Sequence, residues 1–191
     1  MIDSNGSGEK RLFIFECMPK SDRCNEGELL FNLLGMTVDV KHRGEVALKD
    51  LGSKTEFLRY MARKSIARRF DFIHLSGHGD PDGCAFRLPL GKVHPEEFPE
   101  SCFQGRTVTF ASCGLSRNGF MDEFMERTGA KAVIAPLNNV HFDDSAIWYA
   151  YFYYLVLHHG FTSWGAWDRT CRFLCDAPEK GRVKGGFQYW G

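Results

Sequence analysis

The sequence has no excess of charge of either sign, because 24 lysine and arginine residues balance 24 aspartate and glutamate residues. A domain that binds nucleic acid usually carries a net positive charge, so this balance indicates no polyanionic partner. One group of basic residues has helical spacing, namely Arg59, Arg63, Lys64, Arg68 and Arg69. Basic side chains in this pattern are typical of the solvated face of a helix. We therefore expect no direct contact with nucleic acid.

Long hydrophobic runs are also missing. The most apolar stretch, residues 146–157, is shorter than the roughly 20 residues that a transmembrane helix requires. The N-terminal residues do not have the pattern of a signal peptide. Seven cysteines cannot all pair within one chain, which favours a reducing compartment over a framework of disulfides. Together these features predict a cytoplasmic protein that does not contact a membrane.

A complete metal-binding pattern is absent as well. Cys171 and Cys175 are four residues apart, so a helix places both on one face, and His158 and His159 precede them. Zinc sites need ligands in characteristic paired spacings, and no second pair completes the set here. Internal repeats and low-complexity tracts are missing too, which excludes repeat architectures. We expect no metal site.

The pattern that is present is an alternation of strands and helices along 191 residues, the usual length of one domain. Residues 1–9 are polar and glycine-rich and are expected to form a flexible tail before a single domain at 10–191. Strands are expected at 11–16, 37–40, 70–75, 107–112, 131–135 and 186–190. Helices are expected at 28–34, 55–66, 120–127, from Asp143 or Asp144 through 157, and at 164–174. This order predicts a three-layer α/β/α sandwich with a mostly parallel six-stranded sheet, interrupted by an inserted hairpin within 79–105.

His78 and Cys113 each follow a predicted apolar strand. Parallel sheets form their ligand crevice at the carboxyl ends of the strands, so the two side chains are expected to share one cleft. A thiol and an imidazole in contact divide into nucleophile and general acid/base, and the N–H groups of Gly79 and Cys113 could stabilise an oxyanion. The alternative is a loop histidine, a buried apolar cysteine and glycines that only make turns. The spacing alone does not decide between these interpretations.

The two motifs, Ser76-Gly77-His78-Gly79 and Ala111-Ser112-Cys113, resemble the clan of caspases, metacaspases and separases, and within it the CHAT family. Similarity extends over nearly all of 11–191 and includes His74, residues 129–135, Asp143-Asp144 and residues 186–191. The resemblance implies a caspase-like fold, cysteine-dependent cleavage of a protein or peptide substrate, and no metal or organic cofactor. It also implies activity that awaits an activating or regulatory protein partner, in a defence or cell-death pathway. The alternative function is a non-enzymatic scaffold that binds a partner in its cleft.

One position departs from the family pattern. In metacaspases the residue two before the nucleophile is an acid that helps to bind a basic P1 side chain, and here it is Ala111. Acidic residues that could replace it in the substrate pocket are Asp80, Asp82, Asp143, Asp144 and Glu16. For Asp143 and Asp144 we favour a role as helix N-cap over substrate contact. Arg117 could instead select an acidic side chain, as in caspases.

Overall fold

The computed structural model describes residues 10–22, 25–37, 46–174 and 186–191. The predicted N-terminal tail, residues 1–9, lies outside these ranges, as does most of the predicted strand at 37–40. Thr37 itself ends a helix, and the next strand that the structure describes, Val46–Asp50, was not predicted. The first four residues of this strand are half-buried and Asp50 is exposed, which explains why its apolar pattern is weak in the sequence.

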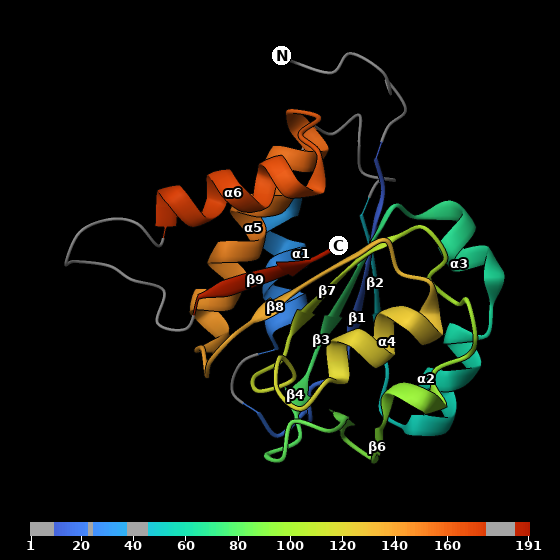
Figure 1. The fold of residues 1–191 in the computed structure, drawn as a ribbon. Helices are drawn as coiled ribbons and strands as arrows, with labels where there is room; N and C mark the ends of the chain where they lie inside the picture. The colour runs from blue at the N-terminus through green and yellow to red at the C-terminus, as the bar shows by residue number, and fades with distance from the viewer. Residues whose placement is uncertain (1–9, 23–24, 38–45, 175–185) are drawn as a thin grey trace.

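The described residues form a six-stranded main sheet, as predicted (Figure 1). Its order is β2-β1-β3-β7-β8-β9, and every neighbouring pair is parallel except β8 and β9. All residues of β3, β7 and β8 are buried, because helices cover both faces of the sheet. The strands are β1 (Leu12–Glu16), β2 (Val46–Asp50), β3 (Phe72–Ser76), β7 (Thr107–Ala111), β8 (Ala132–Pro136) and β9 (Phe187–Trp190).

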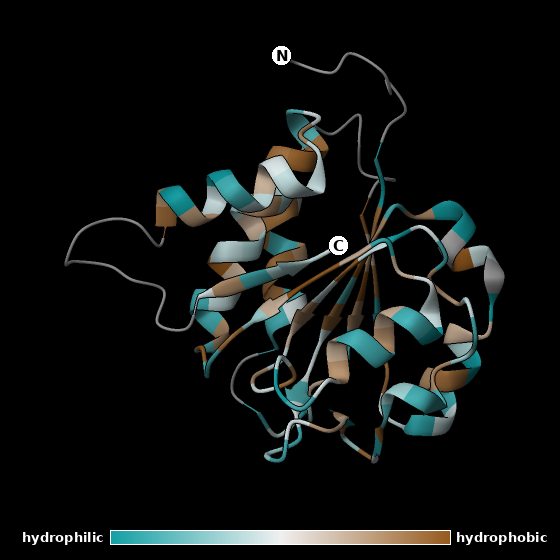
Figure 2. Cartoon of the chain, in the orientation of Figure 1, coloured by the Kyte–Doolittle hydropathy of each residue, from teal (hydrophilic) through white to brown (hydrophobic). Residues whose placement is uncertain are grey.

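Two helical layers enclose this sheet, which gives the predicted sandwich (Figure 1). One apolar cluster joins the sheet to α1 (Glu26–Thr37), α5 (Phe142–His158) and α6 (Ser163–Leu174). The other joins it to α2 (Lys54–Met61), α3 (Lys64–Arg69) and α4 (Phe120–Thr128). Figure 2 shows that the inner strands of the sheet are mostly hydrophobic and that β9 is pale to hydrophilic, whereas α4 alternates between hydrophobic and hydrophilic residues. The sheet therefore has an apolar core on each side.

Several helix boundaries differ from the prediction. The helix expected at 28–34 is longer at both ends, Glu26–Thr37, and two other differences concern the break at Arg63 and the start of α5. The segment 55–66 is not one helix, because Arg63 adopts an extended conformation that separates α2 from α3. No proline or glycine marks this break in the sequence. Asp143 and Asp144 are not the N-cap of α5, because the helix begins earlier and His141 occupies that position. Both acids lie in the first turn, where negative charge interacts favourably with the helix dipole.

The inserted hairpin is present between β3 and β7. Strands β4 (His78–Gly79), β5 (Phe86–Leu88) and β6 (Gly91–Val93) form a small antiparallel sheet, and the 3-10 helix η2 (Pro95–Glu97) follows. Because β4 directly continues β3, the hairpin begins at the candidate histidine.

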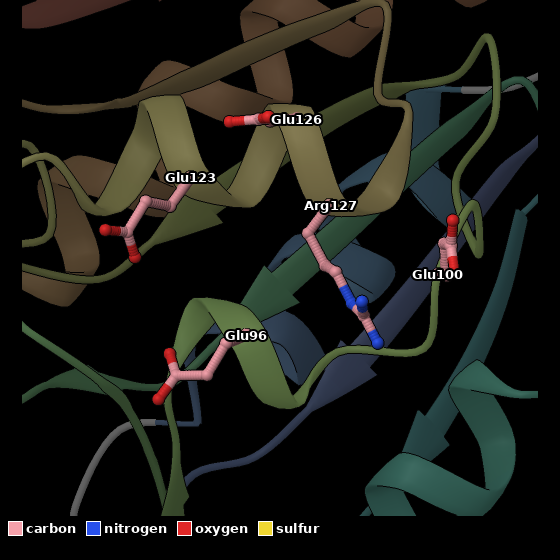
Figure 3. A pocket seen from close by; sticks show the side chains of 5 residues that line it. All are labelled: Glu96, Glu100, Glu123, Glu126 and Arg127. Carbon is pink, nitrogen blue, oxygen red and sulfur yellow. The ribbon is translucent and has the colours of Figure 1, made fainter.

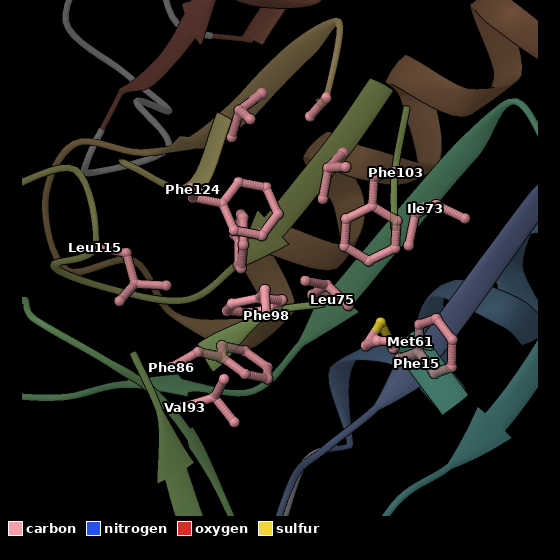
Figure 4. Packing of buried hydrophobic residues seen from close by; sticks show 14 of the residues in the cluster. Phe15, Met61, Ile73, Leu75, Phe86, Val93, Phe98, Phe103, Leu115 and Phe124 are labelled. Carbon is pink, nitrogen blue, oxygen red and sulfur yellow. The ribbon is translucent and has the colours of Figure 1, made fainter. Parts of the chain in front are cut away.

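A cluster of phenylalanines supports the hairpin and the carboxyl end of β7 (Figure 4). Phe124 makes edge contacts with Phe98 and Phe110, at centroid distances of 4.9 and 5.0 Å. Phe86 of β5 contacts Phe110 of β7 at 5.8 Å. Leu115, fully buried in the same cluster, fixes the chain just after Cys113. Close packing of this kind holds the backbone of the candidate site on a rigid base.

Candidate active site

The backbones that carry His78 and Cys113 lie side by side. The parallel register pairs Ser76 with Ala111, and each candidate residue stands two positions beyond its member of this pair. The Ser112 hydroxyl donates to the Gly77 carbonyl at 2.9 Å, which ties the two strand ends together. The approach is so close that a methyl group at Gly79 would overlap the carbonyl oxygen of Cys113. Only glycine permits this contact.

The two reactive side chains are held by different neighbours. The Val140 N–H donates to the Cys113 Sγ at 3.3 Å, and the thiol lies 3.5 Å from the Val140 carbonyl oxygen. The His78 Nε2 lies 2.8 Å from the Asp22 Oδ2, and its ring makes an edge contact with Phe142 at 5.2 Å. Because Val140 and Phe142 are two residues apart, one segment contacts both groups. The thiol and the imidazole themselves share no hydrogen bond in the described structure.

The Cys113 thiol opens into a cleft of about 560 Å³. Its lining combines the start of the hairpin, the loop after β7 and the segment before α5. The residues are Gly79, Asp80, Pro81, Cys113, Gly114, Arg117, Asn139, Val140 and His141. The cleft lies at the carboxyl end of the parallel strands, where such folds bind ligands.

The backbone N–H of Gly79, one of the lining residues, is not part of the hydrogen-bond ladder between β4 and β5. The Asp80 N–H donates to the Ala85 carbonyl at 2.8 Å. Hydrogen-bonded and non-bonded pairs alternate along an antiparallel ladder, so the preceding pair, Gly79 with Phe86, is not hydrogen-bonded. The Gly79 N–H is therefore directed away from β5.

The residues proposed for substrate contact fall into two groups. Asp80 and Arg117 line the cleft, and Asp80 forms an ion pair with Lys92 at 2.9 Å. Ala111 is 1% exposed and packs in the core beneath the cleft. Asp143 and Asp144 are not among the lining residues.

Several residues of the site carry no motif that sequence reasoning could use. Asp22 lies in the loop after β1, and residues 139–141 lie between β8 and α5. The only general signal is that both segments leave the sheet at its carboxyl edge, next to His78 and Cys113.

A buried polar network lies on the α1 side of β3. His74 is fully buried, with Nε2 at 2.9 Å from Glu26 Oε2 and Nδ1 at 2.7 Å from Thr109 Oγ1. Both ring nitrogens are thus engaged within the core, so His74 does not contact His78. The Glu16 carboxyl, 4% exposed, belongs to the same region, and burial raises its pKa to about 7. It accepts hydrogen bonds from the N–H groups of Met18 and Glu28.

A second concave region is acidic and shares no lining residue with the cleft at Cys113. It measures about 640 Å³ and lies between η2 and α4, lined by Glu96, Glu100, Glu123, Glu126 and Arg127 (Figure 3). The Arg127 Nε donates to the Phe98 carbonyl at 2.9 Å. Within the described ranges, no three His, Cys, Asp or Glu side chains are grouped so that they could hold a metal ion. Cys175, one of the cysteines considered for zinc, lies outside those ranges.

None of the helices in the described part of the chain has the length and apolarity needed to cross a bilayer. No family model and no curated protein sequence matches the chain. Solved structures do match. The crystal structure of caspase-1 from Spodoptera frugiperda has a TM-score of 0.57 and 9% sequence identity, covering 96% of this chain and 86% of that chain.

The structure of pro-sf-caspase-1 gives a TM-score of 0.55 and 9% identity, covering 99% of this chain and 93% of that chain. At this level of identity the similarity concerns the fold. It extends over nearly the whole chain and includes the six-stranded, mostly parallel sheet between two helical layers. The chain therefore has a caspase-like fold.

Proposed function

We propose that residues 10–191 form a cysteine endopeptidase domain of the CHAT type, in which Cys113 is the nucleophile and His78 the general acid/base. The observation that carries this proposal is the register of β3 and β7. The pairing of Ser76 with Ala111 supports neighbouring positions for the two reactive groups at the carboxyl edge of the sheet. Cys113 and Gly79 line the cleft there, whereas His78 is not among its lining residues. A caspase-like fold adds a scaffold with which such chemistry is compatible, although fold alone does not define activity.

The reaction proceeds in two halves. The imidazole of His78 takes the proton of the Cys113 thiol, and the sulfur attacks the carbonyl carbon of the scissile peptide bond. The Gly79 and Cys113 N–H groups donate to the oxyanion that develops. The carbon–nitrogen bond then breaks, the amine leaves with the proton from His78, and a thioester remains. Water, deprotonated by His78, hydrolyses the thioester and returns the thiol.

The isolated domain is proposed to be latent. Its thiol is engaged with Val140 and not with the imidazole, so the contact between sulfur and Val140 must be released before proton transfer. A substrate, an activating protein partner or a second copy that reorders residues 139–141 would supply this change. The resemblance to CHAT domains favours a protein substrate in a defence or cell-death pathway.

The P1 preference is proposed from the charges of the cleft. Arg117 favours an acidic P1 side chain, whereas Asp80 favours a basic one when Lys92 is displaced. Matched peptide substrates with aspartate or arginine at P1 decide between them.

The proposal is tested with an electrophilic peptide probe and mass-spectrometric mapping of the adduct. We expect modification of Cys113 to be slowed by about 100-fold or more in His78→Ala, because general base catalysis contributes on that scale. Cys84 is an internal control, because it is an exposed thiol outside the cleft. Its alkylation by a small reagent should not depend on His78. Equal labelling of Cys113 in both proteins would refute the dyad.

The scaffold is the second candidate, and the separate bonding of thiol and imidazole favours it. It predicts that no peptide in a library is cleaved, with or without an added partner. It also predicts a partner that binds Cys113→Ala as tightly as the wild type. Cleavage abolished by Cys113→Ala would exclude it.

A further inference from the structure

A carboxylate from a different part of the chain holds the candidate histidine. The Asp22 Oδ2 lies 2.8 Å from the His78 Nε2, and the two side chains are 32% and 39% exposed. Asp22 belongs to the loop after β1, which neighbours β3 in the sheet. Because Glu16 pairs with Ser76 in register, this loop leaves the sheet at the same level as the segment that carries His78.

The start of the Asp22 loop and the beginning of the following helix are tied to one buried carboxyl. The Met18 N–H donates to the Glu16 Oε1 at 2.9 Å, and the Glu28 N–H donates to the Oε2 at 3.1 Å. The Ser76 hydroxyl donates to the same carboxyl at 3.3 Å and accepts from the Gly27 N–H at 3.0 Å. This loop is thus fastened to the strand that leads to His78.

Asp22 itself is placed by a local turn. Its N–H donates to the Pro19 carbonyl at 2.9 Å, and the Cys17 N–H donates to the Ser76 carbonyl at 2.8 Å. A side chain on an anchored turn loses less conformational freedom when it binds the imidazole than one on a loose loop. The fold therefore holds Asp22 in a position from which its side chain contacts His78 at little entropic cost.

The contact has a chemical consequence for the imidazole. An ionised carboxylate only accepts hydrogen bonds, so the His78 Nε2 carries the proton that it donates to Asp22. A neutral imidazole with its proton on Nε2 has its lone pair on Nδ1. The Nδ1 is then the basic atom, and the imidazolium that forms after proton transfer faces a negative charge.

We propose that Asp22 is a positioning residue that makes the Nδ1 of His78 the base for the Cys113 thiol and stabilises the imidazolium. This inference rests on the proposed cysteine chemistry. It assigns a third side chain to the site, contributed by the loop after β1.

The first measurement is the rate at which the electrophilic peptide probe, which occupies the cleft as a substrate does and can release the contact between the thiol and Val140, modifies Cys113 in the full chain. We expect Asp22→Ala and the isosteric Asp22→Asn to slow this rate by about 10-fold or more, because neither can offset the imidazolium charge. Asp168→Asn is the matched control, because it removes a carboxylate of similar exposure, 39%, on α6 that pairs only with Arg172 among the described residues. It should leave the rate unchanged.

The second measurement is independent of reactivity. Nitrogen-correlated proton NMR of the imidazoles should show a His78 Nε2 proton protected from solvent exchange in the wild type and in Cys113→Ala. The signal should be lost in Asp22→Ala and in His78→Ala. The protection reports the tautomer and the hydrogen bond, and the rate of Cys113 modification in Asp22→Asn separates a role in reactivity from a purely structural contact.

The outcomes separate the two proposals. If Cys113 is modified slowly in His78→Ala but as fast in the Asp22 variants as in the wild type, the role of Asp22 is overturned and the dyad stands. If Cys113 is modified as fast in His78→Ala as in the wild type, both the dyad and the role of Asp22 are overturned. If Asp22→Ala does not fold, Asp22→Asn, which keeps the shape of the side chain, decides the question.

Discussion

Replacement of Glu16 by glutamine should change how the stability of the domain depends on pH. Burial raises the pKa of the Glu16 carboxyl from 4.5 to about 7. Three backbone N–H donors, of Met18, Glu28 and Gly27, oppose this shift, and the charge of Glu26 adds to it. Below pH 4.5 the folded and unfolded chains both bind the proton, and above pH 7 neither does.

Between these values only the folded chain keeps the proton, so the free energy of unfolding falls as the pH rises from about 4.5 to about 7. One pKa unit corresponds to about 1.36 kcal/mol, so the wild type should lose about 3 kcal/mol across this window relative to Glu16→Gln. The variant has no proton to release at this position. Its stability relative to the wild type should therefore increase with pH.

Urea unfolding, followed by tryptophan fluorescence at several pH values across this window, measures the difference between the two proteins. Comparison with Glu16→Gln removes the contributions of other titrating groups. Glu28→Gln is the matched control, because it removes an exposed carboxylate from the start of α1. A difference between wild type and Glu16→Gln that stays constant with pH would refute the reasoning, as would a wild type that gains relative stability at higher pH.

Two further substitutions test the packing of the site and of the network beneath it. Gly79→Ala forces a methyl group onto the Cys113 carbonyl and should cost about 1–3 kcal/mol of stability and slow alkylation of Cys113. Gly52→Ala, where a methyl group meets open space, should do neither, and equal effects would contradict this account. Glu26→Ala leaves the fully buried His74 without its carboxylate partner, and urea unfolding should show a loss of about 3–5 kcal/mol. A loss below about 1 kcal/mol would mean that the pair contributes little.

The sequence was sufficient to place the central strands, because β3, β7 and β8 are buried on both faces and are rich in apolar and β-branched residues. The strand β2 was not predicted, because it lies at an edge of the sheet and has no buried residue. The break at Arg63 was missed for another reason. Periodicity follows the buried face of a helix, and a change in backbone direction without proline or glycine leaves that pattern intact.

In the candidate site, too, residues that follow locally evident strands were predicted, and contacts between distant segments were not. His78 and Cys113 were recognisable because each follows a strand whose burial is evident locally. The pair formed by Asp22 and His78 was not, because it depends on which strands become neighbours, and no local pattern in 17–25 reports that. For Asp143 and Asp144 a local pattern was present, but it was misleading. Their position before an aromatic helix indicated a cap, whereas the helix had already begun at Phe142.

The order of the strands explains why a histidine occupies the middle position of the site. In the sheet β3 lies between β1 and β7, so the residue that follows β3 is the one that can contact loops from both neighbours. A proton carrier must face a nucleophile on one side and a charge-stabilising group on the other, and imidazole is the side chain with two ring nitrogens for these tasks. A one-residue slip of β3 would turn its side chains to the opposite faces and remove His74 and Ser76 from their buried partners. The buried polar network on the α1 side of β3 thus favours the register on which the geometry of Asp22, His78 and Cys113 depends.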